Sequence, residues 1–303
     1  MTAANVNGMT IEYDVHGDDD GEPLLLVMGL GGQLVGWPLE FVDQLVAKGF
    51  RVVRFDNRDV GLSSKTDAPV PTVRRMLAAA VSRRFARSPY LLSDMAADAA
   101  GLLDHLSIAR AHVVGISMGG MIAQTLAIEH PATVASLTSI MSNTGDRKHG
   151  RVRPSLLRRM SKLMTRNPDD AVANGVASFR LISGPHFDEQ RVREMQQEAF
   201  RRSYDAAGTA RQMMAVASSP DRTPQLRRLR VPTLVVHGLL DPLVMPSGGV
   251  ATARAIPGAR LVMYPDMAHD LPRPRWGELI DEIVENTRRA DPGDAAGDRA
   301  PAA

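Results

Sequence analysis

Residues 111–130, AHVVGISMGGMIAQTLAIEH, decide the fold of this chain. The stretch begins with the apolar run of a buried strand, turns through 115–120 and continues as a helical pattern that ends before Pro131. Gly-x-Ser-x-Gly between a strand and a helix is typical of a nucleophile elbow, in which a tight turn lifts a serine above the sheet. By itself the motif also fits a small-residue turn. In this setting it predicts Ser117 as a nucleophile.

Strand and helix patterns alternate on both sides of this unit. The expected strands are 10–15, 23–28, 51–55, 134–140, 231–237 and 260–264, and the expected helices are 38–48, 93–106, 247–255 and 276–287. Ser93 is the expected N-cap of the second of these helices. Such alternation with short loops predicts an α/β protein with a mostly parallel twisted sheet flanked by helices.

The alternation stops after residue 141. Residues 142–225 contain helical patterns and no convincing buried strand, which predicts a helical cap, or lid, inserted into the fold. The remaining parts, 1–141 and 226–289, then form the core. Residues 290–303 are a low-complexity segment that we expect to be a disordered tail.

The composition excludes several classes of protein. The chain has 303 residues, 44% of them hydrophobic and 23% charged, which is typical of a soluble globular protein. It contains no cysteine, so disulfides, thiolate nucleophiles and cysteine-ligated metals are excluded. With 36 basic against 34 acidic residues, no nucleic-acid partner is expected. Because we find neither a secretion signal nor an apolar run of membrane-spanning length, we expect a cytoplasmic protein.

Two further loops supply partners for the serine. Asp241 follows the strand pattern 231–237, and His269 follows 260–264. Because the carboxyl ends of parallel strands share one edge of the sheet, both side chains are expected near Ser117. The order serine, aspartate, histidine is that of the α/β-hydrolase fold. His237 is a plausible neighbour of this site, whereas Asp266 and Asp270 are expected to cap their loop.

An oxyanion hole needs two backbone N–H donors. Met118, directly after the serine, is expected to supply one of them. The other is expected from the loop 28–32, MGLGG, where glycines allow the backbone to approach a ligand closely. A merely flexible turn is the alternative interpretation of these glycines.

Five stretches together resemble the α/β-hydrolase superfamily, namely 24–38, 54–63, 91–106, 113–124 and 266–272. They are most similar to the branch containing aclacinomycin methylesterase and the mycobacterial lipase/esterase-type hydrolases. The resemblance implies Ser117 as nucleophile, Asp241 as acid, His269 as base, and the Leu30 and Met118 amides as the oxyanion hole. Met28 stands where most of the superfamily has histidine, which makes the pocket more apolar. Asp56 and Arg58 are expected to be structural.

A serine nucleophile indicates acyl transfer and separates the chain from epoxide hydrolases and haloalkane dehalogenases, which use aspartate. We therefore expect hydrolysis of an apolar small-molecule ester, with a short to medium acyl or methyl group. No metal and no organic cofactor are implied. The same triad would also suit a thioesterase, lactonase, C–C hydrolase or perhydrolase. A non-catalytic ligand receptor is the alternative from another functional class.

Two basic segments lie outside this site. Residues 72–87 carry five arginines and no acid, and 147–166 are also strongly basic. Such segments are usually solvated helix faces. They also suit peripheral contact with an anionic membrane or the steering of an acidic substrate, as a hypothesis to test.

Overall fold

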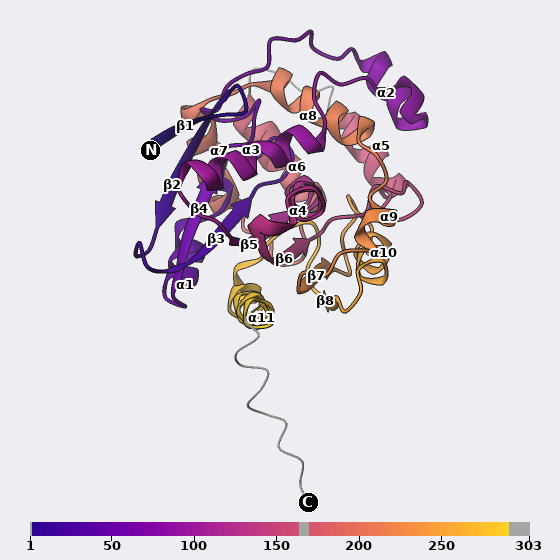
Figure 1. Ribbon diagram of the computed structural model, residues 1–303. Helices are drawn as coiled ribbons and strands as arrows, with labels where there is room; N and C mark the ends of the chain where they lie inside the picture. The colour runs from indigo at the N-terminus through magenta and orange to yellow at the C-terminus, as the bar shows by residue number, and fades with distance from the viewer. Residues whose placement is uncertain (1, 164–169, 291–303) are drawn as a thin grey trace, which may run out of the picture.

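The protein is described here by a computed structural model covering residues 2–163 and 170–290 (Figure 1). Of the expected tail, 290–303, only residue 290 lies in these ranges, so the disorder of the tail stays a prediction. The helices in the described ranges all lack the length and apolar character that crossing a bilayer requires.

The centre of the molecule is an eight-stranded sheet in the order β1-β2-β4-β3-β5-β6-β7-β8. The β1–β2 and β2–β4 pairs are antiparallel, and every pair from β4 to β8 is parallel. This confirms the predicted fold class. The strands are β1 (Thr2–Val6), β2 (Met9–His16), β3 (Glu22–Val27), β4 (Phe50–Phe55), β5 (Ala111–Ile116), β6 (Val134–Ile140), β7 (Thr233–Gly238) and β8 (Arg260–Tyr264).

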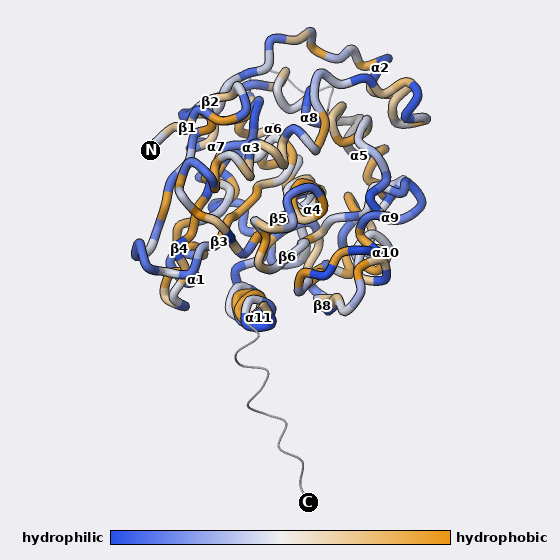
Figure 2. Tube along the Cα trace, viewed as in Figure 1, coloured by the Kyte–Doolittle hydropathy of each residue, from blue (hydrophilic) through white to orange (hydrophobic). Residues whose placement is uncertain are grey.

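Helices cover both faces of the sheet, so its central strands are buried and mostly apolar (Figure 2). On β3, Leu25 and Val27 pack toward α3 and α4, whereas Leu24 and Leu26 pack toward α1 and α11. The covering helices are α1 (Leu39–Val46), α3 (Leu92–His105), α4 (Met118–Glu129), α10 (Ser247–Ala255) and α11 (Trp276–Arg288).

Between β6 and β7, the described residues form helices and no strand. These helices are α5 (Pro154–Leu163), α6 (Ala171–Ile182), α7 (Glu189–Arg202), α8 (Ala206–Ser218) and α9 (Thr223–Leu226). One more helix, α2 (Val73–Val81), projects at the periphery (Figure 1). Short 3-10 turns occupy Leu34–Gly36, Arg83–Phe85, Pro131–Thr133 and Arg273–Arg275.

Two local features differ from the sequence-based expectations. The first strand, β1, was not predicted, although Asn7-Gly8 is a recognised hairpin signal and both residues have positive φ angles, 49° and 72°. The predicted cap of α3 was wrong by two positions, because the N-cap is Leu91 and not Ser93. The Asp94 carboxylate accepts the Leu91 N–H at 2.7 Å, so an acid in the first turn caps the helix.

Candidate active site

Ser117 occupies a strained turn between β5 and α4. Its φ and ψ angles are 56° and −119°, a region that residues other than glycine rarely adopt and that costs about 1–3 kcal/mol. The Ser117 N–H donates to the carbonyl of Ile140 on β6 at 2.8 Å, which anchors the turn to the neighbouring strand. The Ser117 side chain makes no capping hydrogen bond to α4, although the residue lies at the N-terminus of that helix.

Three glycines make this turn sterically possible. A Cβ atom on Gly115 would lie 2.2 Å from the carbonyl oxygen of Gly119, and one on Gly119 would lie 2.1 Å from that of Val27. A Cβ atom on Gly120 would lie 2.7 Å from the Cβ of Ser142. Gly115 and Gly119 are thus required because β3, β5 and α4 approach one another closely, and Gly120 because α4 passes close to the residues that follow β6.

The structure brings Ser117, His269 and Asp241 into one hydrogen-bonded chain. The distance from His269 Nε2 to Ser117 Oγ is 2.9 Å, and that from His269 Nδ1 to Asp241 Oδ2 is 2.7 Å. Asp241 lies on the loop after β7, and His269 lies on the loop after β8. An imidazole held between a hydroxyl and a carboxylate can remove the hydroxyl proton.

The Asp241 carboxylate is fully buried and held by several donors. Its Oδ1 atom accepts the N–H groups of Leu243 and Val244 at 2.8 and 2.9 Å. Burial by itself raises the pKa of this carboxyl, but the His269 charge and hydrogen bonds from His237 and His269 outweigh burial, so the pKa lies below its ordinary value. Asp241 is therefore ionised at neutral pH and able to stabilise an imidazolium.

His237, named above as a neighbour, contacts the Asp241 carboxylate. Its Nε2 atom is 2.7 Å from the carbonyl oxygen of Val244 and 3.4 Å from Asp241 Oδ2. Because a carbonyl can only accept, Nε2 carries a proton. His237 therefore contacts the same carboxylate oxygen, Oδ2, that His269 contacts.

The loop that carries His269 is fixed by its acidic residues. Asp270 accepts the N–H groups of Ala268 and Gly184, both at 3.0 Å. Asp266 forms an ion pair with Arg275 at 2.9 Å. The Asp270 contacts agree with the predicted loop-capping role, whereas Asp266 contacts side chains, those of Arg275 and His186. In addition, the His269 N–H donates to the carbonyl of Ile182 at 2.9 Å, so the end of α6 also restrains this loop.

The loop after β3 passes directly beside the serine. A Cβ atom on Gly29 would lie 3.3 Å from the Cβ of Ser117. Among the described residues, neither the Leu30 nor the Met118 amide donates to another group of the protein, and Met118 is the first residue of α4. Both amides are therefore available to a substrate oxygen near Ser117.

Sequence reasoning missed the residue that holds this loop. The side chain of Gln212, on α8, is fully buried, and its Oε1 atom accepts the Gly31 N–H at 2.8 Å. Its Nε2 atom donates to the carbonyl of Arg58 at 2.8 Å. No local pattern could reveal this contact, because 181 residues separate Gln212 from Gly31.

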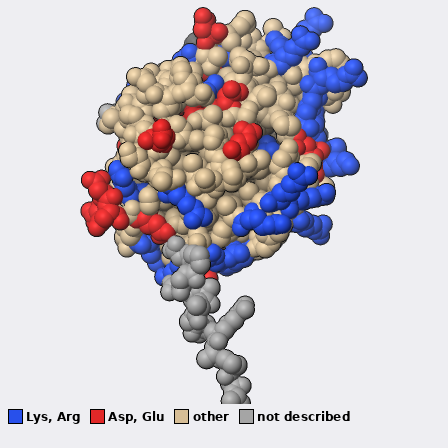
Figure 3. Space-filling view, viewed as in Figure 1, with Lys and Arg blue, Asp and Glu red and all other residues tan. Residues whose placement is uncertain are grey.

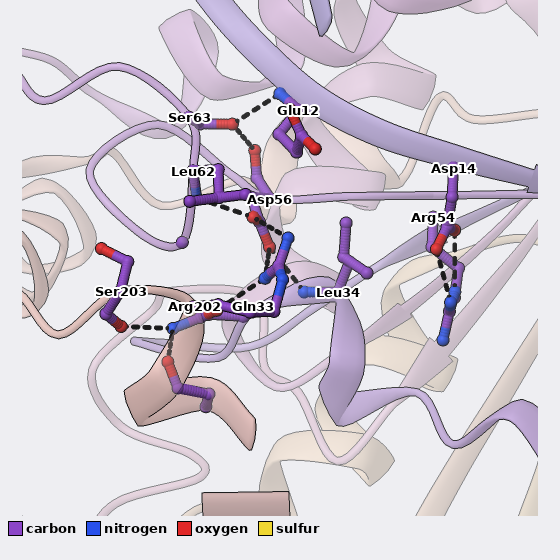
Figure 4. Close-up of polar contacts among 12 residues, drawn as sticks. Glu12, Asp14, Gln33, Leu34, Arg54, Asp56, Leu62, Ser63, Arg202 and Ser203 are labelled. Carbon is purple, nitrogen blue, oxygen red and sulfur yellow. Dashed lines mark hydrogen bonds and ion pairs between the residues drawn. The ribbon is translucent and has the colours of Figure 1, made fainter. Parts of the chain in front are cut away.

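A second contact joins α7 to the same loop (Figure 4). The buried Asp56 carboxylate accepts the N–H groups of Leu34 and Leu62 at 2.7 and 2.9 Å and pairs with Arg202 at 2.9 Å. Arg202 also donates to Gln33 Oε1 at 2.6 Å. These contacts support the structural role expected for Asp56.

The other residue expected to be structural, Arg58, pairs with the buried Asp98 on α3. The distance from Arg58 Nε to Asp98 Oδ2 is 2.6 Å. The guanidinium also lies over the Tyr90 ring, 5.1 Å from its centroid. Both contacts support the structural role expected for Arg58.

A cavity of about 930 Å³ is lined by His269 and by Ile116, the residue before Ser117. Met28 and Leu30 are also among the residues that line it, together with residues of α6 and α7. This volume is within the range of cavities that enclose small organic ligands. Among the described residues, no group of three or more histidine, aspartate or glutamate side chains is placed to hold a metal.

The chain is similar in sequence and in structure to several known proteins. A family described as alpha/beta hydrolase fold matches residues 22–272. Rhodomycin D methylesterase DnrP of Streptomyces peucetius is 30% identical over 297 residues, covering 90% of this chain and 93% of that protein. The enol-lactonase from Burkholderia xenovorans LB400 superposes with a TM-score of 0.72 at 27% identity, covering 95% of this chain and all of that one. An esterase from Exiguobacterium antarcticum, 17% identical with a TM-score of 0.74, shares the fold.

Proposed function

This chain belongs to the α/β-hydrolase family, and on that premise we propose that it hydrolyses carboxylic esters through an acyl-enzyme on Ser117. The observation that carries this proposal is the hydrogen-bonded chain from Ser117 through His269 to Asp241 beside a 930 Å³ cavity. The proposal assigns Ser117 as nucleophile, His269 as general base and acid, and Asp241 as the group that orients the imidazole.

In the acylation half-reaction, His269 Nε2 takes the Ser117 hydroxyl proton while Oγ attacks the ester carbonyl carbon. The carbonyl oxygen becomes an oxyanion, which the Leu30 and Met118 amides stabilise. His269 then gives its proton to the leaving alcohol as the carbon–oxygen ester bond breaks. The depressed pKa of Asp241 keeps a negative charge beside the imidazolium throughout.

In the deacylation half-reaction, water replaces the alcohol. His269 removes a proton from this water, whose oxygen attacks the acyl carbon, and the same two amides again stabilise the oxyanion. The proton then returns to Ser117 Oγ as the acid is released. Each cycle consumes one water and needs no other reactant.

We further propose that residues 142–225 act as a cap on a core formed by 1–141 and 226–289. Support comes from the cavity, which is lined both by core residues such as Met28, Leu30 and His269 and by residues of α6 and α7. Large apolar cap residues in this lining, such as Phe179 and Met195, favour an apolar ester.

The relatives favour two substrate classes. The methylesterase relative makes a methyl ester the first candidate, and the size of the cavity leaves room for a bulky acid component. The enol-lactonase neighbour makes a lactone, which is a cyclic ester, the second candidate. Both substrates need the same serine, histidine and oxyanion hole.

The test is hydrolysis of p-nitrophenyl esters from acetate to palmitate by the wild type and Ser117→Ala. We expect serine-dependent turnover with an optimum at short or medium chains, and a loss of about 10³-fold or more in Ser117→Ala. Ser155→Ala, an exposed position on α5, is the matched control and should keep full activity. Turnover that survives in Ser117→Ala would refute the proposal. Methyl esters and lactones assayed in parallel then separate the two substrate classes.

A further inference from the structure

The outer face of α2 and of the 3-10 turn after it exposes large apolar side chains. Val73, Leu77 and Val81 are 53%, 65% and 82% exposed, and Phe85 in the turn is 57% exposed. Residues four apart share one side of a helix, so the three α2 residues form a stripe. On the opposite side, Ala79 is buried against the protein. Solvent thus meets the apolar side of this helix, which is unusual unless that side binds something.

Arginines flank this stripe without any compensating acid. Between Asp67 and Asp94 the chain has no acidic residue. The exposed arginines around the stripe are Arg74, Arg75, Arg84 and Arg87. Figure 3 shows basic side chains gathered on the side of the molecule where Figure 1 places α2, α5 and α10.

Residues near the start of the second basic segment form hydrogen bonds with α2 and with the 3-10 turn after it. Arg147 Nη2 donates to the carbonyl of Ala79 at 3.2 Å, and Arg83 donates to the carbonyl of Gly145. Within this segment, the exposed basic residues that the structure describes include Lys148, Arg151, Arg153, Arg158 and Arg159. Positions 164–166 lie outside the described residues. The nearby Asp146 carboxylate is engaged by His149 at 2.5 Å.

We infer that the stripe Val73, Leu77, Val81 and its flanking arginines form a docking face for an anionic lipid bilayer. A basic helix with one apolar side lies in the plane of a membrane surface, with that side among the acyl chains and its cations at the phosphates. A second copy of this chain would bring arginine against arginine. A nucleic acid would neutralise the arginines but leave the apolar stripe in water.

The test measures binding of the whole protein to vesicles at low ionic strength. We expect binding to phosphatidylcholine vesicles that contain phosphatidylserine, much weaker binding to pure phosphatidylcholine, and loss of binding as salt is added. Leu77→Ser with Val81→Ser should weaken binding at least about tenfold by removing apolar contact. Arg74→Gln with Arg84→Gln should weaken it about tenfold and flatten the salt dependence.

The matched control is Leu39→Ser with Arg288→Gln, which removes an exposed leucine and an exposed arginine from α1 and α11. This variant should bind vesicles like the wild type. Thermal midpoints by circular dichroism show that each variant is folded, and they do not depend on esterase activity. Equal binding to neutral vesicles, no binding at low salt, or α2 variants that bind like the wild type would overturn the inference. A dimer in solution that Leu77→Ser disrupts would also overturn it, in favour of self-association.

Discussion

Replacing Gln212 by methionine should slow catalysis although this residue does not line the cavity. Gln212 holds the Gly31 N–H and the Arg58 carbonyl, each at 2.8 Å, and Gly31 directly follows Leu30, whose amide is assigned to the oxyanion hole. Methionine has a similar volume but neither strong hydrogen-bonding group. The exchange therefore loosens the loop without opening a large hole, and Gln212 is a positioning residue in this account.

The magnitude follows from the two lost bonds. Leaving the buried Arg58 carbonyl unpaired costs about 1–3 kcal/mol and the half-buried Gly31 N–H adds less, so the variant should lose about 1–4 kcal/mol of stability. Losing one oxyanion donor outright costs about 10²–10³ in kcat. Because the Leu30 amide is loosened and not removed, we expect kcat to fall about 10- to 100-fold with KM nearly unchanged.

The assay is p-nitrophenyl ester hydrolysis together with urea denaturation. Met213→Gln, the reverse exchange at the neighbouring and partly exposed position, is the control and should change neither measurement. Gln212→Glu adds a second readout, because a protonated glutamic acid can accept from Gly31 and donate to Arg58 as glutamine does. Its kcat relative to the wild type should rise as the pH is lowered. A Gln212→Met variant that is destabilised but keeps wild-type kcat would refute the positioning role.

Two other outcomes follow from the site. Gly119→Ala should destabilise the fold by about 1–3 kcal/mol or more in urea denaturation, because its Cβ would lie 2.1 Å from the Val27 oxygen. The control is Gly277→Ala on α11, where a Cβ meets no atom within 4 Å, and this change should be neutral or stabilising by up to about 1 kcal/mol. Equal effects of the two substitutions would contradict the steric argument. The Asp241 carboxyl has a lowered pKa in the folded state, because the His269 charge and hydrogen bonds outweigh burial. The ionised carboxylate therefore stabilises the folded protein at pH values above the unfolded pKa of about 3.9, and this stabilisation is lost as the pH falls through the folded pKa. The difference in unfolding free energy between wild type and Asp241→Asn should therefore shrink as pH falls below about 4, and a difference independent of pH would show that Asp241 does not titrate as described.

Local pattern was sufficient for much of the fold and for the candidate catalytic residues. The run 111–130 specifies a strand, a turn and a helix through its own periodicity and glycines, and loops at the carboxyl edge of a parallel sheet must lie together. Ser117, Asp241 and His269 could therefore be assigned before their distances were known. Strand β1 was missed because its short alternating pattern is weak, although the Asn7-Gly8 turn carried the signal.

Contacts between distant segments were decided only by the tertiary structure. Gln212 reaches Gly31, and Arg202 reaches Asp56 across 146 residues, through packing that neither segment encodes alone. Likewise, the sequence shows that residues 72–87 are basic. The exposure of Leu77 and Val81 to solvent, however, depends on which side of α2 packs against the rest of the protein. The sequence by itself thus predicted seven of the eight strands and the candidate residues at the carboxyl edge of the sheet, because both follow from local periodicity and from the alternation of strands and helices. The supports of the oxyanion loop and the exposed apolar stripe depend on how helices pack, which is a property of the whole chain.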